Sequence, residues 1–328
     1  MSRGLGRRAA RAAGIAAGPD CLRPPRAHLS IGASQSVAAD LDTAECAARG
    51  VEVIQRPLGG GSVWVDPGQT VVCVVFPAGS HPGRPAAVFD ACLGPMLRVC
   101  THFGLAARRV GEQDIWADGR KILGSGAATI GTSLVFATSI LRRFDADAFA
   151  AVVRCPSPAF RDWLAEALAD GMGDWSRAGA EPEDAALLPV LREAFAQAFG
   201  WSLVEGGLAG TEISAVEAAR AELAEPPDGG TRRHVRYGIK VNQWRYVLED
   251  AGQAPSLRLD VDAGRVRRIA SDDAELSARL QACAGEPVAR YRLEERLVQG
   301  GMSDEAARAV LDRLLRMTQD IPLAGEPA

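Results

Sequence analysis

A run of three glycines at residues 59–61 follows Arg56 and precedes an alternating stretch that ends in Asp66. Glycine between two strands weakens their pairing, and the usual compensation is a turn with positive φ or a close approach of the backbone to a ligand. Successive N–H groups in such a loop form a concave anion site, and a neighbouring guanidinium offers forked donors to a phosphate or carboxylate. The run matches neither a P-loop nor a GxGxxG pattern. The glycines alone therefore leave a plain flexible bend as the alternative.

Lysine is scarce in this sequence. The chain holds 37 Lys plus Arg residues, yet only Lys121 and Lys240 are lysines. This composition suggests that arginine is used wherever a positive charge alone is sufficient. A lysine is then expected where a compact primary amine is needed, because the planar guanidinium of arginine cannot replace it. The alternative is that two lysines remain by chance.

Length and composition bound the class of protein. A chain of 328 residues suggests two domains, and 47% hydrophobic with 24% charged residues is typical of a soluble globular protein. A net charge of −4 gives no sign of a nucleic-acid partner, and no run of about 18 apolar residues predicts a membrane span. The seven scattered cysteines favour reduced thiols and a cytoplasmic location over a disulfide frame or a zinc site.

Hydrophobic periodicity and turn residues predict the elements that must position these groups. Apolar patterns predict strands at 28–35, 51–57, 62–66, 69–77 and 131–141. A D-G turn predicts a hairpin over 113–130, and the segment 256–271 is predicted to form a strand pair around its own turn. Predicted helices lie at 85–104, 144–171 (two short ones), 183–199, 214–224, 273–284 and 303–317, the last with Ser303 as N-cap.

Two motifs together resemble a known family. The stretch GVEVIQRPLGGGSVWVD, followed after about fifty residues by QDIWADGRKILGSG, resembles the biotin/lipoate ligase family and, within it, the lipoate-protein ligases. Their first motif is Arg-Arg-x-x-Gly-Gly-Gly-(Ala/Ser)-Val-x-His-Asp, and their second contains Asn-Asp before Gly-Arg-Lys. HLSIGASQS resembles the family's Ser-(Ile/Val)-Gly-x-x-Gln segment, and IKVNQWRY with SLRLDVDAGRVRRI resembles its accessory domain. The resemblance covers about residues 28 to 300.

The resemblance implies an α+β fold: a class II synthetase-like mixed sheet flanked by helices, as in biotinyl and lipoyl ligases, with a small C-terminal α+β accessory domain. It implies a catalytic domain over 28–224, a Pro- and Gly-rich linker over 225–234 and an accessory domain over 235–328. Residues 1–27 form a poorly defined N-terminal segment in this division.

The same resemblance assigns the site. Lys121 falls on the family's catalytic lysine, which touches the acyl carboxylate and the α-phosphate, where negative charge builds during attack on ATP. Asp114 matches the family's aspartate and is the candidate for holding Mg²⁺ with ATP. The residues expected to bind ATP and the lipoyl-adenylate are Arg56, Gly59, Gly60, Gly61, Ser62, Val63, Trp64, Asp114, Gly124 and Ser125; the last two are expected to lie behind the lysine.

The implied activity is that of an ATP-dependent lipoate or octanoate protein ligase. It would form lipoyl-AMP and transfer the lipoyl group to a lysine of a lipoyl domain, with ATP and Mg²⁺ as cofactors. The implied partners are lipoyl-domain acceptors such as the E2 subunits of 2-oxoacid dehydrogenases or the glycine cleavage H protein. The basic segment 232–245 is expected to be either a solvated face or a docking surface for such a domain.

The sequence departs from the family pattern at Gln55, Val65 and Gln113, where the family has Arg, His and Asn. These departures make a degenerate paralogue and a non-enzymatic lipoate- or lipoyl-domain-binding module alternatives. A biotin ligase is a further alternative, although the sequence lacks the Gly-Arg-Gly-Arg loop that biotin ligases usually have. The main alternative is an ATP-independent octanoyl or lipoyl acyltransferase of the same fold, which needs a nucleophilic cysteine. Cys155, flanked by Arg154, is the candidate for that thiol; a small hydrophobic residue at a helix start is its other interpretation.

Overall fold

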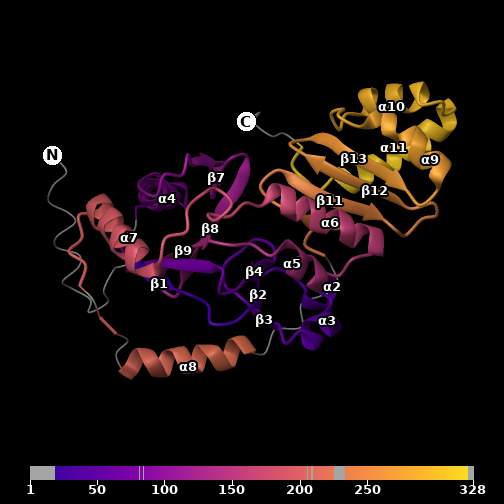
Figure 1. The fold of residues 1–328 in the computed structure, drawn as a ribbon. Helices are drawn as coiled ribbons and strands as arrows, with labels where there is room; N and C mark the ends of the chain where they lie inside the picture. The colour runs from indigo at the N-terminus through magenta and orange to yellow at the C-terminus, as the bar shows by residue number, and fades with distance from the viewer. Residues whose placement is uncertain are drawn as a thin grey trace. The chain divides into compact units, whose positions relative to one another are not determined.

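The computed structural model describes residues 19–80, 82, 83, 85–204, 206, 207, 210–224 and 233–323 (Figure 1). The chain forms two compact units, each assembled from three segments. The first comprises the described residues of 1–34, 47–144 and 173–228, and the second those of 35–46, 145–172 and 229–328. The domain division predicted from the sequence places a single boundary in the linker at 225–234. Residues 225–232 of this linker lie outside the described residues, and the predicted division stays a prediction.

The first unit is built on a six-stranded antiparallel sheet in the order β1-β5-β9-β8-β7-β6. Its strands are β1 (Pro19–Leu22), β5 (Gln69–Phe76), β6 (Arg108–Val110), β7 (Asp114–Ala117), β8 (Arg120–Ile130) and β9 (Ser133–Leu141). Even-numbered residues of β5 are fully or almost fully buried, Val72, Val74 and Phe76 among them. They pack in one core with helices α4 (Pro85–His102) and α7 (Asp184–Phe199), so the helices cover this face of the sheet.

The hairpin predicted from its D-G turn is confirmed. Strands β7 and β8 pair antiparallel on either side of Asp118 and Gly119. Both turn residues have positive φ, 50° and 72°, as a two-residue type I′ turn requires.

A second, three-stranded sheet carries the glycine run. Strand β2 (His28–Ile31) pairs in parallel with β3 (Glu52–Gln55) and antiparallel with β4 (Val63–Val65). Residues 59–61 lie in the connection between β3 and β4. A Cβ on Gly32, just after β2, would lie 2.0 Å from the Gly60 carbonyl oxygen, so this close approach of two backbones requires glycine at Gly32.

The structure contains elements that periodicity did not predict: β1, β6, α2 (Val37–Asp40), α3 (Thr43–Ala48) and α10 (Arg290–Gln299). All but α10 are too short for a period to be visible. Helix α4 continues through Gly94-Pro95, and α8 (Gly210–Ala224) starts four residues earlier than predicted. None of the described helices is long and apolar enough to cross a membrane.

The second unit contains a four-stranded antiparallel sheet, β10-β11-β12-β13. The strands are β10 (Gly238–Lys240), β11 (Arg245–Asp250), β12 (Leu257–Asp262) and β13 (Arg265–Ser271), and the helices are α5 (Ala146–Val152), α6 (Pro158–Gly171), α9 (Ala274–Leu280), η1 (Gln281–Cys283), α10 and α11 (Asp304–Thr318). Ser303 caps α11 by accepting from the Ala306 N–H, which confirms its predicted role. Alternate residues of β11 and β12 pack with α9, α10 and α11 in an apolar core, while α6 lies across the other face (Figure 1).

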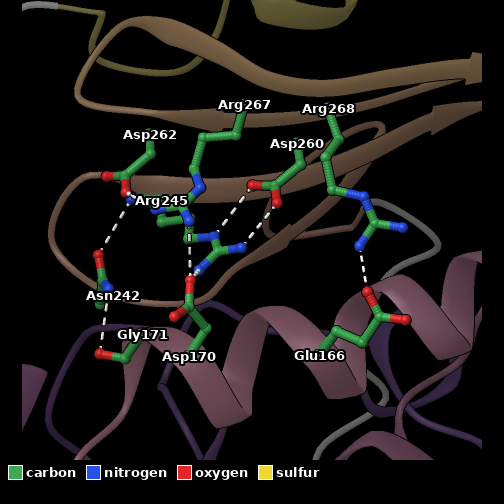
Figure 2. Close-up of polar contacts among 9 residues, drawn as sticks. All are labelled: Glu166, Asp170, Gly171, Asn242, Arg245, Asp260, Asp262, Arg267 and Arg268. Atoms are coloured by element: carbon green, nitrogen blue, oxygen red, sulfur yellow. Dashed lines mark hydrogen bonds and ion pairs between the residues drawn. The ribbon is translucent and has the colours of Figure 1, made fainter. Parts of the chain in front are cut away.

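The face of β11 and β12 toward α6 is charged and buried. Arg245 donates to both carboxylate oxygens of Asp260 (3.0 and 2.7 Å) and to Asp170 near the end of α6 (2.7 Å; Figure 2). The side chains of Arg245 and Asp260 are only 5% and 1% exposed. Arg258 and Glu249 form a second buried pair at 2.8 Å on the same face. Because each charge has an opposite partner in hydrogen-bond contact, the desolvation of the face is offset.

The basic segment 232–245 is mixed within the described residues: Arg236 and Lys240 are exposed, Arg233 is half-buried and Arg245 is buried. The prediction of a solvated face is therefore wrong for Arg245, and a docking role for the segment stays a prediction. Arg245 is buried between two carboxylates. Arg233 donates to the Arg154 carbonyl and lies 3.9 Å from Asp40, and Arg236 lies over the Tyr237 ring. The clustering of positive charge along the sequence could not reveal acidic partners that come from other segments.

Replacing Arg245 by methionine will lower the free energy of unfolding by about 3–5 kcal/mol, because Asp260 is left buried without its counter-charge. The matched control is Arg267→Met. Arg267 also contacts Asp170 but is 45% exposed, so its loss will cost under about 1 kcal/mol. Urea denaturation of the two variants beside the wild type measures both values, and equal losses would contradict the buried pairing.

Candidate functional site

Lys121 and Asp114, which the sequence places in one motif, are in direct contact. The Lys121 Nζ lies 2.9 Å from the Asp114 Oδ1. The Asp114 side chain is 5% exposed and that of Lys121 is 21% exposed, so the ammonium is held by a buried carboxylate and remains open to solvent. This arrangement orients a positive charge toward whatever anion binds above it.

A β-bulge makes this contact possible. Asp114 is opposite Gly124 and Trp116 is opposite Lys121, so one extra residue, Ile122, interrupts the β7–β8 register. In a regular strand, residues three apart face opposite sides. The extra residue reverses the alternation, which puts Lys121, Gly124 and Asp114 on one face while Ile122 and Leu123 both enter the core.

Glycine lines the strand beneath the lysine. A Cβ on Gly124 would lie 2.8 Å from Lys121 Cε and 2.9 Å from Nζ, so only glycine lets the stem of the lysine lie flat, as the sequence predicted. Two residues on, a Cβ on Gly126 would lie 3.3 Å from Leu58 of the β3–β4 loop. Same-face neighbours on a strand are about 7 Å apart. The glycine loop and the lysine therefore meet over adjacent positions of one strand.

Arg56 organises the glycine loop from within. Its guanidinium donates to the carbonyls of Ser30 (2.5 Å), Gly59 (3.0 Å) and Gly61 (2.7 Å). Burial lowers the pKa of the Arg56 guanidinium to about 10, so it stays charged at neutral pH. The sequence suggested Arg56 as a phosphate or carboxylate contact, whereas its donors here are directed at backbone carbonyls.

The loop keeps its donors available. Gly60 has a φ of 95°, and within the described part of the chain no hydrogen bond uses the N–H groups of residues 59–61. Gly59 and Gly60 are exposed, so solvent at these donors can be exchanged for an anion. Ser62 continues the loop into β4, where Val63 and Trp64 pair with Ser30 and Leu29.

Other sequence-selected residues have structural roles. Ser125 lies on the face opposite to Gly124, and its hydroxyl donates to the Gln113 carbonyl at 2.5 Å, so it does not lie behind the lysine. Gln55, which replaces a family arginine, donates its amide to the Gly32 and Ala33 carbonyls. The Trp64 ring is buried and donates to Asp66 at 2.8 Å.

Sequence reasoning missed Gly32 and Gly126. The Gly124-Ser-Gly126 spacing could have indicated this surface, because glycines two residues apart on a strand leave one face without side chains. The bulge at Ile122 left no such signal: two adjacent apolar residues occur in many regular buried strands.

Comparison with known proteins agrees with this geometry. Residues 22–184, which include the glycine loop, Asp114 and Lys121, match the family described as the lipoyl protein ligase A/B catalytic domain. Through this domain, the chain belongs to the lipoyl protein ligase A/B family. The α+β fold predicted from the sequence is confirmed by the solved structures of lipoate-protein ligases that it matches.

Relatives of both chemical types are found. The chain is 27% identical over 220 residues to octanoyltransferase LipM of Kyrpidia tusciae, covering 59% of this chain and 80% of that protein. The structure is similar to a bi-partite lipoate protein ligase from Thermoplasma acidophilum, studied with its E2 lipoyl domain (TM-score 0.60, 20% identity, 66% of this chain and 85% of that one). It is also similar to lipoate-protein ligase A bound with ATP (TM-score 0.56, 19% identity, 66% and 87%).

Replacing Gly124 by alanine will displace the lysine. The new Cβ conflicts with the flexible end of Lys121 rather than with backbone, so the melting temperature will stay near that of the wild type. A shift of the amine by about 1 Å will lower acyl-transfer activity about 100-fold. Gly206→Ala is the control, since nothing lies within 4 Å of its Cβ position. Equal activity of the two variants would show that the strand beneath Lys121 tolerates a side chain at position 124.

Replacing Arg56 by lysine will loosen the loop although the charge is kept. One ammonium on a flexible stem cannot reproduce the guanidinium's fork, so carbonyls of Ser30, Gly59 or Gly61 lose their donor. We expect the free energy of unfolding to fall by about 1–3 kcal/mol. Chemical denaturation at neutral pH is the measurement, and an unchanged midpoint would mean that charge alone holds the loop.

Proposed function

We propose that this protein is an ATP-dependent lipoate or octanoate protein ligase. The observation that carries the proposal is the Lys121–Asp114 pair held over a glycine-bared strand beside a loop with available N–H groups. Carboxylate activation brings two anions together, and a compact ammonium between them lowers the cost of that approach. The acid beside it suits a reaction that uses a nucleotide, whereas thioester exchange has no need of it.

In the first step, an oxygen of the acyl carboxylate attacks the α-phosphorus of ATP. The bond from that phosphorus to the bridging oxygen breaks and pyrophosphate leaves with the electron pair. Lys121 stabilises the charge that builds on the α-phosphate, and the N–H groups of residues 59–61 bind the anion. In the second step, the amine of an acceptor lysine attacks the acyl carbon of the mixed anhydride, AMP leaves, and the amine loses a proton.

Asp114 can contribute to binding Mg²⁺, which takes oxygen ligands from carboxylates and phosphates. No group of three or more His, Cys, Asp or Glu side chains in the described residues could form a metal site by itself. A Mg²⁺ at Asp114 would thus depend on the nucleotide for most of its ligands. Bound there, it would neutralise charge on the departing pyrophosphate.

We propose a lipoyl domain as the acceptor, such as those of dehydrogenase E2 subunits or the H protein. The support is family membership, together with the Thermoplasma relative studied with its E2 lipoyl domain. Lipoate or octanoate is the corresponding acyl substrate. ATP as co-substrate is supported by the relative described as bound with ATP.

Incubation with ATP, Mg²⁺, lipoate and an unmodified lipoyl domain will add one lipoyl mass to the domain, read by intact mass spectrometry. Lys121→Ala will abolish the gain. Lys121→Arg will also lower it at least about 100-fold, because the larger head cannot lie over Gly124 although it can still neutralise Asp114. A mass gain without ATP would sink the ligase proposal.

ATP-independent acyl transfer is the second candidate, and the similarity to octanoyltransferase LipM favours it. Cys155 lies two residues before Ser157, the N-cap of α6. Burial raises the pKa of the Cys155 thiol, and nearby Arg161 and Arg233 only partly oppose this. The thiol is therefore mostly protonated at neutral pH, and a reaction through its thiolate would accelerate as the pH rises.

Cys155→Ser separates the two candidates. Transfer from an octanoylated carrier protein to a lipoyl domain, without ATP, would be lost in this variant if Cys155 forms the thioester. Under the ligase proposal the same variant retains the ATP-dependent mass gain within about twofold, since exchange of sulfur for oxygen at a half-buried position conserves volume. The two assays run on one preparation of each variant.

A further inference from the structure

Gln69 is a buried amide that joins the two sheets of the first unit. It begins β5 in the six-stranded sheet and is 0% exposed. Its Nε2 donates to the Trp64 carbonyl at 2.5 Å, in β4 of the three-stranded sheet. Its Oε1 accepts from the Ser139 hydroxyl at 2.5 Å, in β9. Sequence reasoning gave Gln69 no role beyond starting a strand.

The direction of each hydrogen bond is fixed by chemistry. The Trp64 carbonyl can only accept, so the NH₂ group of Gln69 must face it. The Oε1 then faces Ser139, whose hydroxyl must donate. No other side chain of similar length presents a neutral donor and a neutral acceptor in this way, which explains a polar residue at a fully buried position.

The bridge ends beside the catalytic lysine. Ser139 is directly opposite Gly124 in the β8–β9 ladder, and Gly124 is the residue against which Lys121 lies. At its other end, Trp64 lies in the strand that directly follows the glycine loop. The Gln69 amide thus links the strand after the anion-binding loop to the strand position next to the amine.

We propose that Gln69, held by Ser139, is a positioning residue that fixes the glycine loop at the correct distance above Lys121. This role rests on the proposed function, because it concerns the approach of two bound anions to one ammonium. Both parts of the site lie on different sheets, so their separation is set by contacts between the sheets and not by either ladder. A buried, doubly hydrogen-bonded amide defines such a separation more narrowly than apolar packing, which tolerates small slips.

Three variants test this clamp, by which we mean the Gln69 amide with its hydrogen bonds to Trp64 and Ser139. Gln69→Glu keeps the shape and the acceptor for Ser139 but places an oxygen against the Trp64 carbonyl. Ser139→Ala removes one bond, and Ser139→Thr restores the hydroxyl on a residue that suits a strand. The control is Thr70→Val, the next residue of β5, which is 3% exposed and whose hydroxyl has no partner among the described residues.

The first readout needs no substrate. Hydrogen–deuterium exchange of peptides covering 56–64 will quicken by about tenfold or more in Gln69→Glu and Ser139→Ala, the effect of losing one buried hydrogen bond. It will stay at the wild-type rate in Ser139→Thr and Thr70→Val. Exchange in Gln69→Glu equal to that in Thr70→Val would overturn the proposal.

The second readout is the rate of lipoyl-domain modification. The clamp predicts that kcat falls about 10- to 100-fold in Ser139→Ala and Gln69→Glu, with KM for lipoate nearly unchanged and with recovery in Ser139→Thr. A loss of kcat in Thr70→Val of the same size would reveal a general effect of core disruption and count against the clamp. If the wild type modifies no lipoyl domain with ATP, the ligase proposal fails, and the exchange measurement still decides whether Gln69 fixes the loop.

Discussion

The single extra residue in the β7–β8 ladder, Ile122, sets the geometry of the site. Side chains on a strand alternate strictly, so a regular hairpin that buries Leu123 would leave Lys121 on the core side of the sheet, away from Asp114 and Gly124. The bulge lets the core keep two consecutive apolar side chains while the amine reaches the opposite face. The Lys121–Asp114 ion pair and the position of the lysine over Gly124 both depend on this change of parity.

Arginine and lysine divide the work according to their shapes. The buried guanidiniums serve structure: Arg56 binds three loop carbonyls, and Arg245 bridges two carboxylates. Both tasks use a planar fork with several fixed donors. The side chain of Lys121 is slim and its amine is compact, so it fits against the backbone of a strand position that has no Cβ. The scarcity of lysine in the sequence is thus meaningful at this one position, while Lys240 has no comparable place in the site.

The hairpin and its turn could be predicted from a local signal, the D-G dipeptide. The fold and the site residues Lys121, Asp114 and Gly124 were predicted from the resemblance of two motifs to a known family, whereas the direct contact of Lys121 with Asp114 was not predicted. Long-range features were not predictable. The basic segment 232–245 was predicted to be a solvated face or a docking surface. Its Arg245 is instead buried and contacts Asp170 of α6, which lies 75 residues earlier in the chain. The roles of Ser125 and Gln69 depend on strand parity and on pairing between sheets, which no window of sequence contains.

The interleaving of the two units has a consequence for how such a chain could be divided in evolution or in the laboratory. The second unit consists of 35–46, 145–172 and 229–328. Along the sequence, the chain therefore passes from the first unit to the second three times. A gene break near the Pro- and Gly-rich segment would separate Arg245, Arg258 and their β-strands from α6. Both products would then carry charged side chains that have lost their buried partners. A two-chain version of this protein, in the manner of the bi-partite Thermoplasma ligase, could therefore arise only if its fragments rejoin tightly. One cut in the sequence cannot yield the two units as separate proteins.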